Sequence, residues 1–178
     1  METDYRAMFH ALHPGFFERS SVQGMPEDAV YEEMVLSLSE AECLDTPLPC
    51  PDGITFSLCR GTSPGLHEAV HLVDPDWVQY FGPSQRVLRA LDGERTVSFC
   101  VLDSMGSFAG LRIAGPGCVG TVPDMRHRGI GQRMVQIATA IFRYEGYDLS
   151  YIHYTGVSPF YAGLGYETVL RWNRAGFI

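Results

Sequence analysis

The pattern of apolar and polar positions along the chain predicts helices packed on a sheet. An apolar stripe at helical spacing predicts a long helix at residues 129–145, which Gly146 would end. Residues 86–102 predict a hairpin around the Asp92-Gly93 turn. Runs of strand length are found at residues 34–39, 54–60, 111–115, 118–122, 149–154 and 166–172. Shorter helices are expected at residues 4–13, at 74–81 and at 158–165, and one is expected to start with Ser63 as its cap and Pro64 in its first turn. The sequence therefore predicts a mixed α/β (α+β) fold.

A chain of 178 residues has the length of one domain with a proper core. The pattern is clear from residue 54 onward and hard to interpret before it. We therefore expect a domain at residues 51–178, and an N-terminal extension at residues 1–50 that packs on it.

Composition narrows the class of function. The net charge of -8 argues against general nucleic-acid binding, which needs a basic face. No stretch of eighteen apolar residues predicts a membrane span, and the first residues lack the pattern of a secretory signal. Five cysteines without a C-x-x-C pair favour free thiols in a reducing cytoplasm.

The stretch HEAVH at residues 67–71 raises one catalytic hypothesis. Two histidines one helical turn apart with a glutamate between them form the core of a zinc-protease site. Such a site needs a third ligand, and residues 72–77 hold no further histidine. A buried stripe of Leu66, Val70 and Val73 explains the same pattern as an ordinary amphipathic helix. We therefore expect no metal, and a zinc hydrolase stays an alternative.

A second stretch, MRHRGIGQRM at residues 125–134, indicates an anion site. Here a predicted strand runs into a turn with three arginines, two glycines and no acid, and a strong helix follows. Free backbone N–H groups at a helix N-terminus, together with nearby arginines, bind phosphates well. The G-x-G-x-x-G fingerprint of dinucleotide folds is absent, and a P-loop needs a lysine, which this chain lacks.

Two motifs in order resemble the GNAT N-acetyltransferases. The stretch T-V-P-D-M-R-H-R-G-I-G resembles that family's motif A, Q/R-x-x-G-x-G/A, with Arg126, Gly129 and Gly131 at its fixed positions. About thirty residues later, Y-T-G-V-S-P-F-Y-A-G-L-G-Y at residues 154–166 is similar to motif B. The resemblance is firm over residues 85–172 and absent over the first fifty. It implies a central, mostly antiparallel, twisted sheet flanked by helices.

The resemblance also implies acetyl-CoA as donor and an amine as acceptor, which attacks the thioester directly. By resemblance, the donor-binding residues are Val119, Gly120, Thr121, Val122, Arg126, His127, Arg128, Gly129, Ile130, Gly131, Gln132, Arg133 and Tyr154. Tyr161 matches the tyrosine that protonates the departing thiolate, a general-acid role.

The sequence identifies the general base less clearly than the general acid. Many members of the family carry a carboxylate on the strand before motif A, but GPGCVGTVP has none. His153 on the next strand is our first candidate, and water relayed to Glu68, His67 or His71 is another route. We further expect Glu68, His71 and Asp76 to border the acceptor cleft and to recognise a cationic amine.

The acceptor itself is left open between a small amine, an antibiotic, a peptide N-terminus and a protein lysine. An acyl-CoA-binding module without catalysis is an alternative from another class. Dimers are common in the family that the motifs resemble, so a homodimer is a further expectation.

Overall fold

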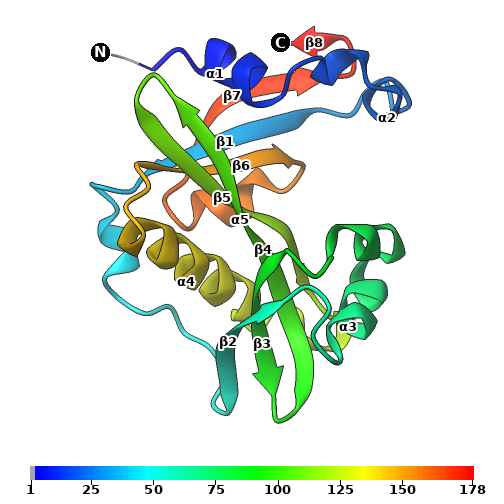
Figure 1. Ribbon diagram of the computed structural model, residues 1–178, viewed down its shortest axis with the longest axis vertical. Coiled ribbons are helices and arrows are strands. Elements are labelled where there is room, and N and C mark those ends of the chain that lie inside the picture. The colour runs from blue at the N-terminus through cyan, green and yellow to red at the C-terminus, as the bar shows by residue number, and fades with distance from the viewer. Residues whose placement is uncertain (1–2) are drawn as a thin grey trace.

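The computed structural model describes residues 3–178, so Met1 and Glu2, the first residues of the expected extension, lie outside it. In the described part of the chain, one sheet has the strand order β2-β3-β4-β5-β6-β1-β7-β8 (Figure 1). Its strands are β1 Tyr31–Ser37, β2 Ile54–Arg60, β3 Arg86–Asp92, β4 Arg95–Phe108, β5 Leu111–Thr121, β6 Leu149–Thr155, β7 Glu167–Asn173 and β8 Gly176–Phe177.

Helices lie on both sides of this sheet. The α-helices are α1 Tyr5–Leu12, α2 Ser20–Gln23, α3 Leu66–Val73, α4 Ile130–Tyr144 and α5 Ser158–Ala162. Short 3₁₀-helices are η1 Phe16–Glu18, η2 Glu42–Leu44, η3 Pro75–Tyr80 and η4 Pro123–Met125. None of the helices in residues 3–178 is long and apolar enough to cross a membrane. The expected mixed fold, with helices around a mostly antiparallel sheet, is confirmed.

Local predictions are confirmed where strong local signals exist. The strand at residues 54–60 and the helix before Gly146 are found as expected, and Gly146 has the positive φ of 77° that suits a helix stop. The predicted start of α3 is wrong. Its N-cap is Gly65, while the Ser63 hydroxyl accepts a hydrogen bond from the Arg60 N–H at 3.2 Å.

Strand β1 corrects the interpretation of the first fifty residues. It pairs antiparallel with β6 on one side and with β7 on the other. Residues 31–37 are therefore an interior strand of the sheet and not an addition packed on it. In Figure 1, β1 crosses the upper half of the molecule between the orange β6 and the red β7.

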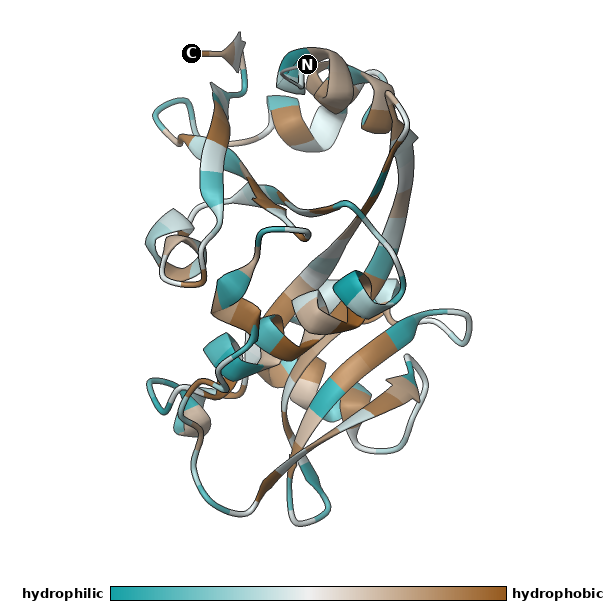
Figure 2. Cartoon of the chain, turned by 90° about the vertical axis from the view of Figure 1, so that its left-hand side faces the viewer, coloured by the Kyte–Doolittle hydropathy of each residue, from teal (hydrophilic) through white to brown (hydrophobic). Residues whose placement is uncertain are grey.

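The main core lies where α3 and α4 cover the strands β3 to β5. Leu66, Phe99, Met134 and Phe142 are almost fully buried there. A separate aromatic cluster around Phe9, Phe16 and Trp172 joins α1 and η1 to β7. Figure 2 shows hydrophobic and hydrophilic positions alternating along the helices and strands, as expected of elements with one buried face.

Candidate active site

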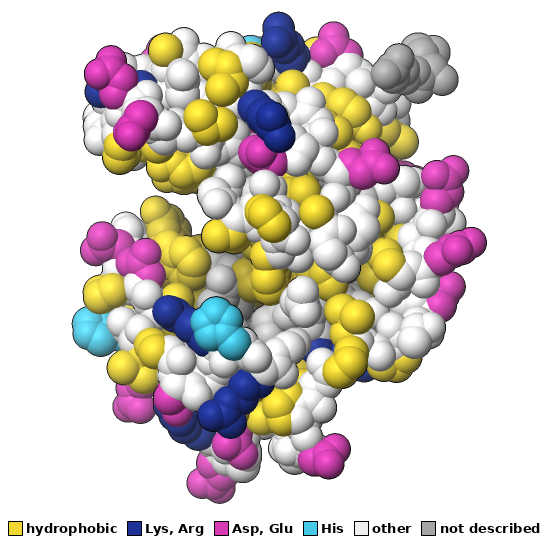
Figure 3. All heavy atoms as spheres, turned by 180° about the vertical axis from the view of Figure 1, so that it is seen from behind, with side chains coloured by type: hydrophobic (Ala, Val, Ile, Leu, Met, Phe, Trp, Pro, Cys, Tyr) yellow, Lys and Arg dark blue, Asp and Glu magenta, His cyan; other side chains and the backbone are white. Residues whose placement is uncertain are grey.

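A cleft opens where the two parallel strands of the sheet part. Strands β5 and β6 are paired only at Ile113–Leu149 and Ala114–Ser150. Beyond Ala114, no strand in the described chain pairs with the side of β5 that faces β6. Unpaired backbone donors and acceptors need another partner, such as water or a ligand. Figure 3 shows the opening from behind as a deep notch between the upper and lower halves.

The predicted anion turn lies at the end of the parted strand β5. His127 and Gly129 both adopt left-handed backbone, with φ of 61° and 81°. Such alternating conformations turn successive N–H groups toward one point, which makes an anion-binding concavity. Helix α4 then begins without a side-chain cap and without an acid in its first turn. Its first N–H groups therefore stay available to a phosphate.

The three arginines of this stretch are not equivalent. Arg126 donates from Nε to the Thr121 carbonyl at 3.0 Å, and Arg128 donates to the Asp124 carbonyl at 3.2 Å. Both side chains are exposed at the turn. Arg133 instead donates to Gln136 Oε1 at 2.6 Å. Gln136 also accepts from the Leu48 N–H, so Arg133 belongs to the packing of the loop before residue 50.

The other predicted donor-binding residues differ in whether their side chain or only their backbone could contact a ligand. Val122 and Ile130 are buried, so only their backbone can face a ligand, whereas Gln132 is exposed. Gly131 is closely packed, since a Cβ there would lie 3.2 Å from Thr121 Oγ1 and 3.6 Å from the Phe160 ring. Gly120 packs on Phe99, because a Cβ there would lie 2.5 Å from that ring.

Tyr161 on α5 lies on the side of the cleft opposite β5. It belongs to a small apolar cluster with Ile152 on β6, and Val119 of β5 packs against the same cluster. Burial raises the pKa of Tyr161 well above its usual value, and nearby Tyr166, Cys100 and Cys118 add to the shift. No hydrogen bond within residues 3–178 involves its hydroxyl. The group is therefore protonated at neutral pH and has its proton available.

His153 on β6 is paired with a carboxylate that the sequence analysis missed. Its Nδ1 lies 2.9 Å from Glu33 Oε2, and Glu33 on β1 is completely buried. The imidazole side chain itself is 21% exposed. A surface-like run, Tyr-Glu-Glu-Met, gave no hint of this role, because only the placement of β1 beside β6 brings Glu33 to the histidine.

The ring of His13 lies flat against that of His153. The two centroids are 3.7 Å apart with 12° between the planes. Burial lowers the pKa of His13 to about 3, helped by the nearby His153 and Arg19. His13 is therefore neutral at physiological pH, and no hydrogen bond in the described structure reaches its buried Nε2.

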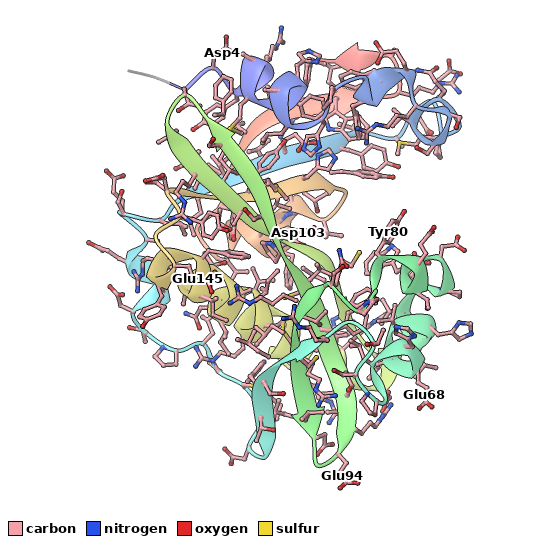
Figure 4. The ribbon with its side chains drawn as sticks, viewed as in Figure 1. Asp4, Glu68, Tyr80, Glu94, Asp103 and Glu145 are labelled. Carbon is pink, nitrogen blue, oxygen red and sulfur yellow. The ribbon has the colours of Figure 1, made fainter. Side chains whose placement is uncertain are left out.

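The residues expected to border the acceptor cleft are exposed on α3 and η3. Figure 4 places Glu68 at the lower end of this part of the chain and Tyr80 at its upper end, so Glu68 lies on the side away from the notch. His71 and Asp76 are also exposed, and their role stays a prediction.

The HEAVH stretch forms the helix α3, and its first histidine already has a partner in the protein. His67 Nε2 lies 2.9 Å from the Phe81 carbonyl oxygen, so this contact occupies one ring nitrogen. Within residues 3–178, no three histidine, cysteine or acidic side chains are grouped as metal ligands would be. The geometry of α3 therefore lends no support to the zinc alternative.

Other side chains surround the opening instead. Burial raises the pKa of the Cys118 thiol on β5 to about 11, and the charges of Asp103 and Asp74 contribute. Both carboxylates therefore lie near the parted strand, Asp103 from β4 and Asp74 from the end of α3. Figure 4 shows Asp103 at the centre of the molecule, at about the height of Tyr80.

Three tyrosines from β1, β6 and η3 lie near one another. Tyr154 is 42% exposed and meets Tyr31 edge to face, with the centroids 4.8 Å apart. Burial raises the pKa of Tyr154, and the hydroxyls of Tyr31 and Tyr80 add to the shift. Tyr80 on η3 therefore lies within electrostatic reach of Tyr154 on β6. These contacts place Tyr154, which was predicted as a donor-binding residue, near Tyr31 and Tyr80.

Comparisons with known proteins bear on the fold. No family model matches the sequence, and no curated protein matches it significantly. Solved structures do match. A GCN5-related glucosamine N-acetyltransferase region in a fungal multi-domain GH3 β-N-acetylglucosaminidase aligns with a TM-score of 0.63 and 20% identity, over 82% of this chain and 20% of that one.

Two further solved structures have a similar fold. A GCN5-related N-acetyltransferase from Sphaerobacter thermophilus has a TM-score of 0.55 and 20% identity, over 81% of this chain and 50% of that one. One from Kribbella flavida has a TM-score of 0.55 and 18% identity, over 87% of this chain and 60% of that one. This chain thus spans less than two thirds of each. It has the GNAT fold, as the two motifs indicated.

Proposed function

We propose that this protein is an N-acetyltransferase that moves the acetyl group of acetyl-CoA to an amine. One observation carries the proposal. Strands β5 and β6 part after Ala114, and β5 then leads directly into the arginine–glycine turn at the start of α4. A long thioester with a pyrophosphate at its far end suits this arrangement, because the parted strand offers backbone partners and the turn offers N–H groups and positive charge.

The donor would be held by two parts of the chain. Arg126 and Arg128, with the N–H groups of residues 129–132, would bind the pyrophosphate. The free edge of β5 at residues 119–121 would bind the pantetheine arm through backbone hydrogen bonds. A backbone N–H placed at the thioester carbonyl would also stabilise the negative charge that develops there.

The acceptor would enter from the side of the notch lined by Tyr80, Tyr154, Asp74 and Asp103. Carboxylates near the parted strands would favour an ammonium group, and exposed aromatic rings also attract cations. The base His153 would take one proton from the ammonium. The free amine nitrogen would then form the new C–N bond as the C–S bond breaks, and Tyr161 would give its proton to the thiolate. The attacking nitrogen would lose its second proton in the same step, and that proton would restore the Tyr161 hydroxyl.

Direct attack fits the site better than an acetyl-cysteine intermediate. Cys118 is the thiol on the parted strand, and only the thiolate form is a good nucleophile. Because burial and two carboxylates raise its pKa to about 11, almost all of it is the neutral thiol at pH 7. The donor and the amine would therefore have to be bound together in one ternary complex.

Calorimetry with acetyl-CoA tests the binding half of this proposal. Arg128→Ala should weaken acetyl-CoA roughly 10- to 100-fold, the loss expected for one hydrogen bond to a charged group. Arg60→Ala is the matched control, since both arginines are exposed and each donates one side-chain hydrogen bond to a carbonyl. Equal binding by all three proteins would show that the turn does not hold the donor.

Release of free CoA in the presence of an amine panel tests the catalytic half. Turnover with at least one amine, dependent on both substrates, is the expected result. Tight acetyl-CoA binding without turnover of any amine would instead favour a binding module without catalysis.

A further inference from the structure

Glu33 is a fully buried carboxylate that binds four hydrogen-bond donors. Its Oε1 accepts from Trp172 Nε1 at 2.6 Å and from the Tyr154 N–H at 3.2 Å. Its Oε2 accepts from the Tyr151 hydroxyl and faces His153 Nδ1 at 2.9 Å. No lysine or arginine is bound to it in the described structure. A buried carboxylate is costly unless such donors surround it, so this set of contacts holds the group rigidly.

These contacts fix the state of the His153 ring. The Trp172 and Tyr154 N–H groups can only donate hydrogen bonds, and the Tyr151 hydroxyl also donates to Glu33. With the carboxylate ionised, Nδ1 must carry a proton to make its own bond. In the neutral ring, Nε2 then holds the lone pair, which is the arrangement of a general base oriented by a carboxylate.

Other groups near the ring act on its charge. The titratable side chains that face it are Glu33 from β1, Tyr151 and Tyr154 from β6, and His13 after α1, with Arg19 near His13. His13 is stacked on the ring and stays neutral, so it adds no counter-charge. Phe9 and Phe16 also contact the ring, tilted and edge to face, at centroid distances of 5.8 and 5.1 Å. Among these groups, Glu33 is the one whose carboxylate can form an ion pair with an imidazolium.

We propose that Glu33 and His13 are positioning residues that hold His153 as its Nδ1–H tautomer, with Nε2 ready to accept the acceptor's proton. This inference rests on the proposed acetyltransferase function and extends it. It assigns a catalytic contribution to the first fifty residues, which the motifs do not reach. The base on β6 and its orienting carboxylate on β1 would then take the place of a carboxylate on β5.

The first experiment measures the pH dependence of kcat/KM for Glu33→Gln. The amide can donate to Nδ1 and so favours the wrong tautomer, and we expect kcat to fall about 100-fold or more. The acid limb of the profile should also move to lower pH, because the imidazolium loses its counter-charge. The matched control is Glu32→Gln, which removes a carboxylate on the same strand that binds Thr168 and Arg171 instead.

If Glu33 had a purely structural role, Glu33→Gln would lower kcat/KM at every pH without shifting the acid limb of the pH profile. That result would overturn the inference. So would a Glu33→Gln profile equal to that of Glu32→Gln. The acetyl-CoA affinity of both variants should stay close to that of the wild type, which separates a lost base from a lost fold.

A second experiment needs no activity. Two-bond ¹⁵N–¹H correlation spectra report the tautomer of each histidine ring, and His153→Gln assigns the signal. The neutral Nδ1–H form of His153 in the wild type is expected, and the Nε2–H form would contradict the inference. If every amine fails in the turnover assay while the Nδ1–H form is observed, the proposed function is at fault and the Glu33–His153 geometry stands.

Discussion

Replacing Gly115 with alanine tests how closely β5 and β6 approach before they part. Gly115 follows the last paired residue, Ala114, on β5. A Cβ at this position would lie 1.9 Å from the Tyr151 carbonyl oxygen and 3.0 Å from its carbon. The obstacle is backbone of a central strand and cannot rotate away as a side chain could. The alanine must therefore push the two strands apart.

The cost follows from that overlap. Overpacking a well-packed interior costs about 1–3 kcal/mol, and a backbone obstacle belongs in the upper part of that range. For a domain of this size, each kcal/mol lowers Tm by roughly 2–4 °C. We therefore expect Gly115→Ala to melt about 4–12 °C below the wild type in a thermal scan.

Gly117→Ala is the control on the same strand. Its Cβ would meet nothing closer than Asp103 Oδ2 at 3.8 Å, which is ordinary contact. The change in Tm should then stay within about 2 °C, since a surface-like substitution shifts stability by about 0.5 kcal/mol or less. If the two variants melt together near the wild-type temperature, β5 and β6 are not held as closely as the structure has them.

Four further outcomes follow from the site. Tyr161→Phe should lower kcat about 100-fold with unchanged Tm and acetyl-CoA affinity, because its hydroxyl bonds nothing in the described protein. Asp103→Asn should raise the acceptor KM roughly tenfold while calorimetry finds the same affinity for acetyl-CoA. Cys118→Ser should keep most activity and intersecting initial-velocity plots, whereas an acetyl-enzyme would give parallel plots and lose activity in the variant. His13, whose pKa is lowered from 6.5 to about 3, stays neutral in the folded state, so the unfolded chain takes up the extra proton as pH falls below 6.5. Stability is lost in that window, and His13→Phe should show a smaller drop in Tm between about pH 7 and pH 5.

Sequence alone could identify what local signals encode. The turn at residues 126–131 carries its own evidence, because arginines, glycines and the missing acids are all adjacent in the chain. The strand at residues 54–60 and the helix that ends at Gly146 are likewise local. The predicted start of α3 is wrong because Ser63-Pro64 is a good cap by type, yet the left-handed Gly65, with φ of 74°, is the residue that precedes the helix.

Long-range placement could not be predicted in the same way. A strand pattern at residues 34–39 says nothing about its neighbours, so the position of β1 between β6 and β7 was not foreseen. Glu33 was overlooked for the same reason, since its partners Tyr151 and Trp172 lie 118 and 139 residues away in the chain. Candidate His153 was found from its residue type, whereas its orienting carboxylate needed the fold.

The placement of β1 also divides the site by chain segment. The proposed donor-binding residues come from one continuous stretch, residues 119–132, whose geometry depends on local turns and on the start of α4. The proposed base depends instead on contacts among α1, β1, β6 and β7, with Glu33 at their centre. If His153 is the base, changes in the first fifty residues should alter proton transfer while the turn at residues 126–131 stays intact. The motif resemblance over residues 85–172 therefore includes the proposed base His153 but not its proposed positioning residues Glu33 and His13.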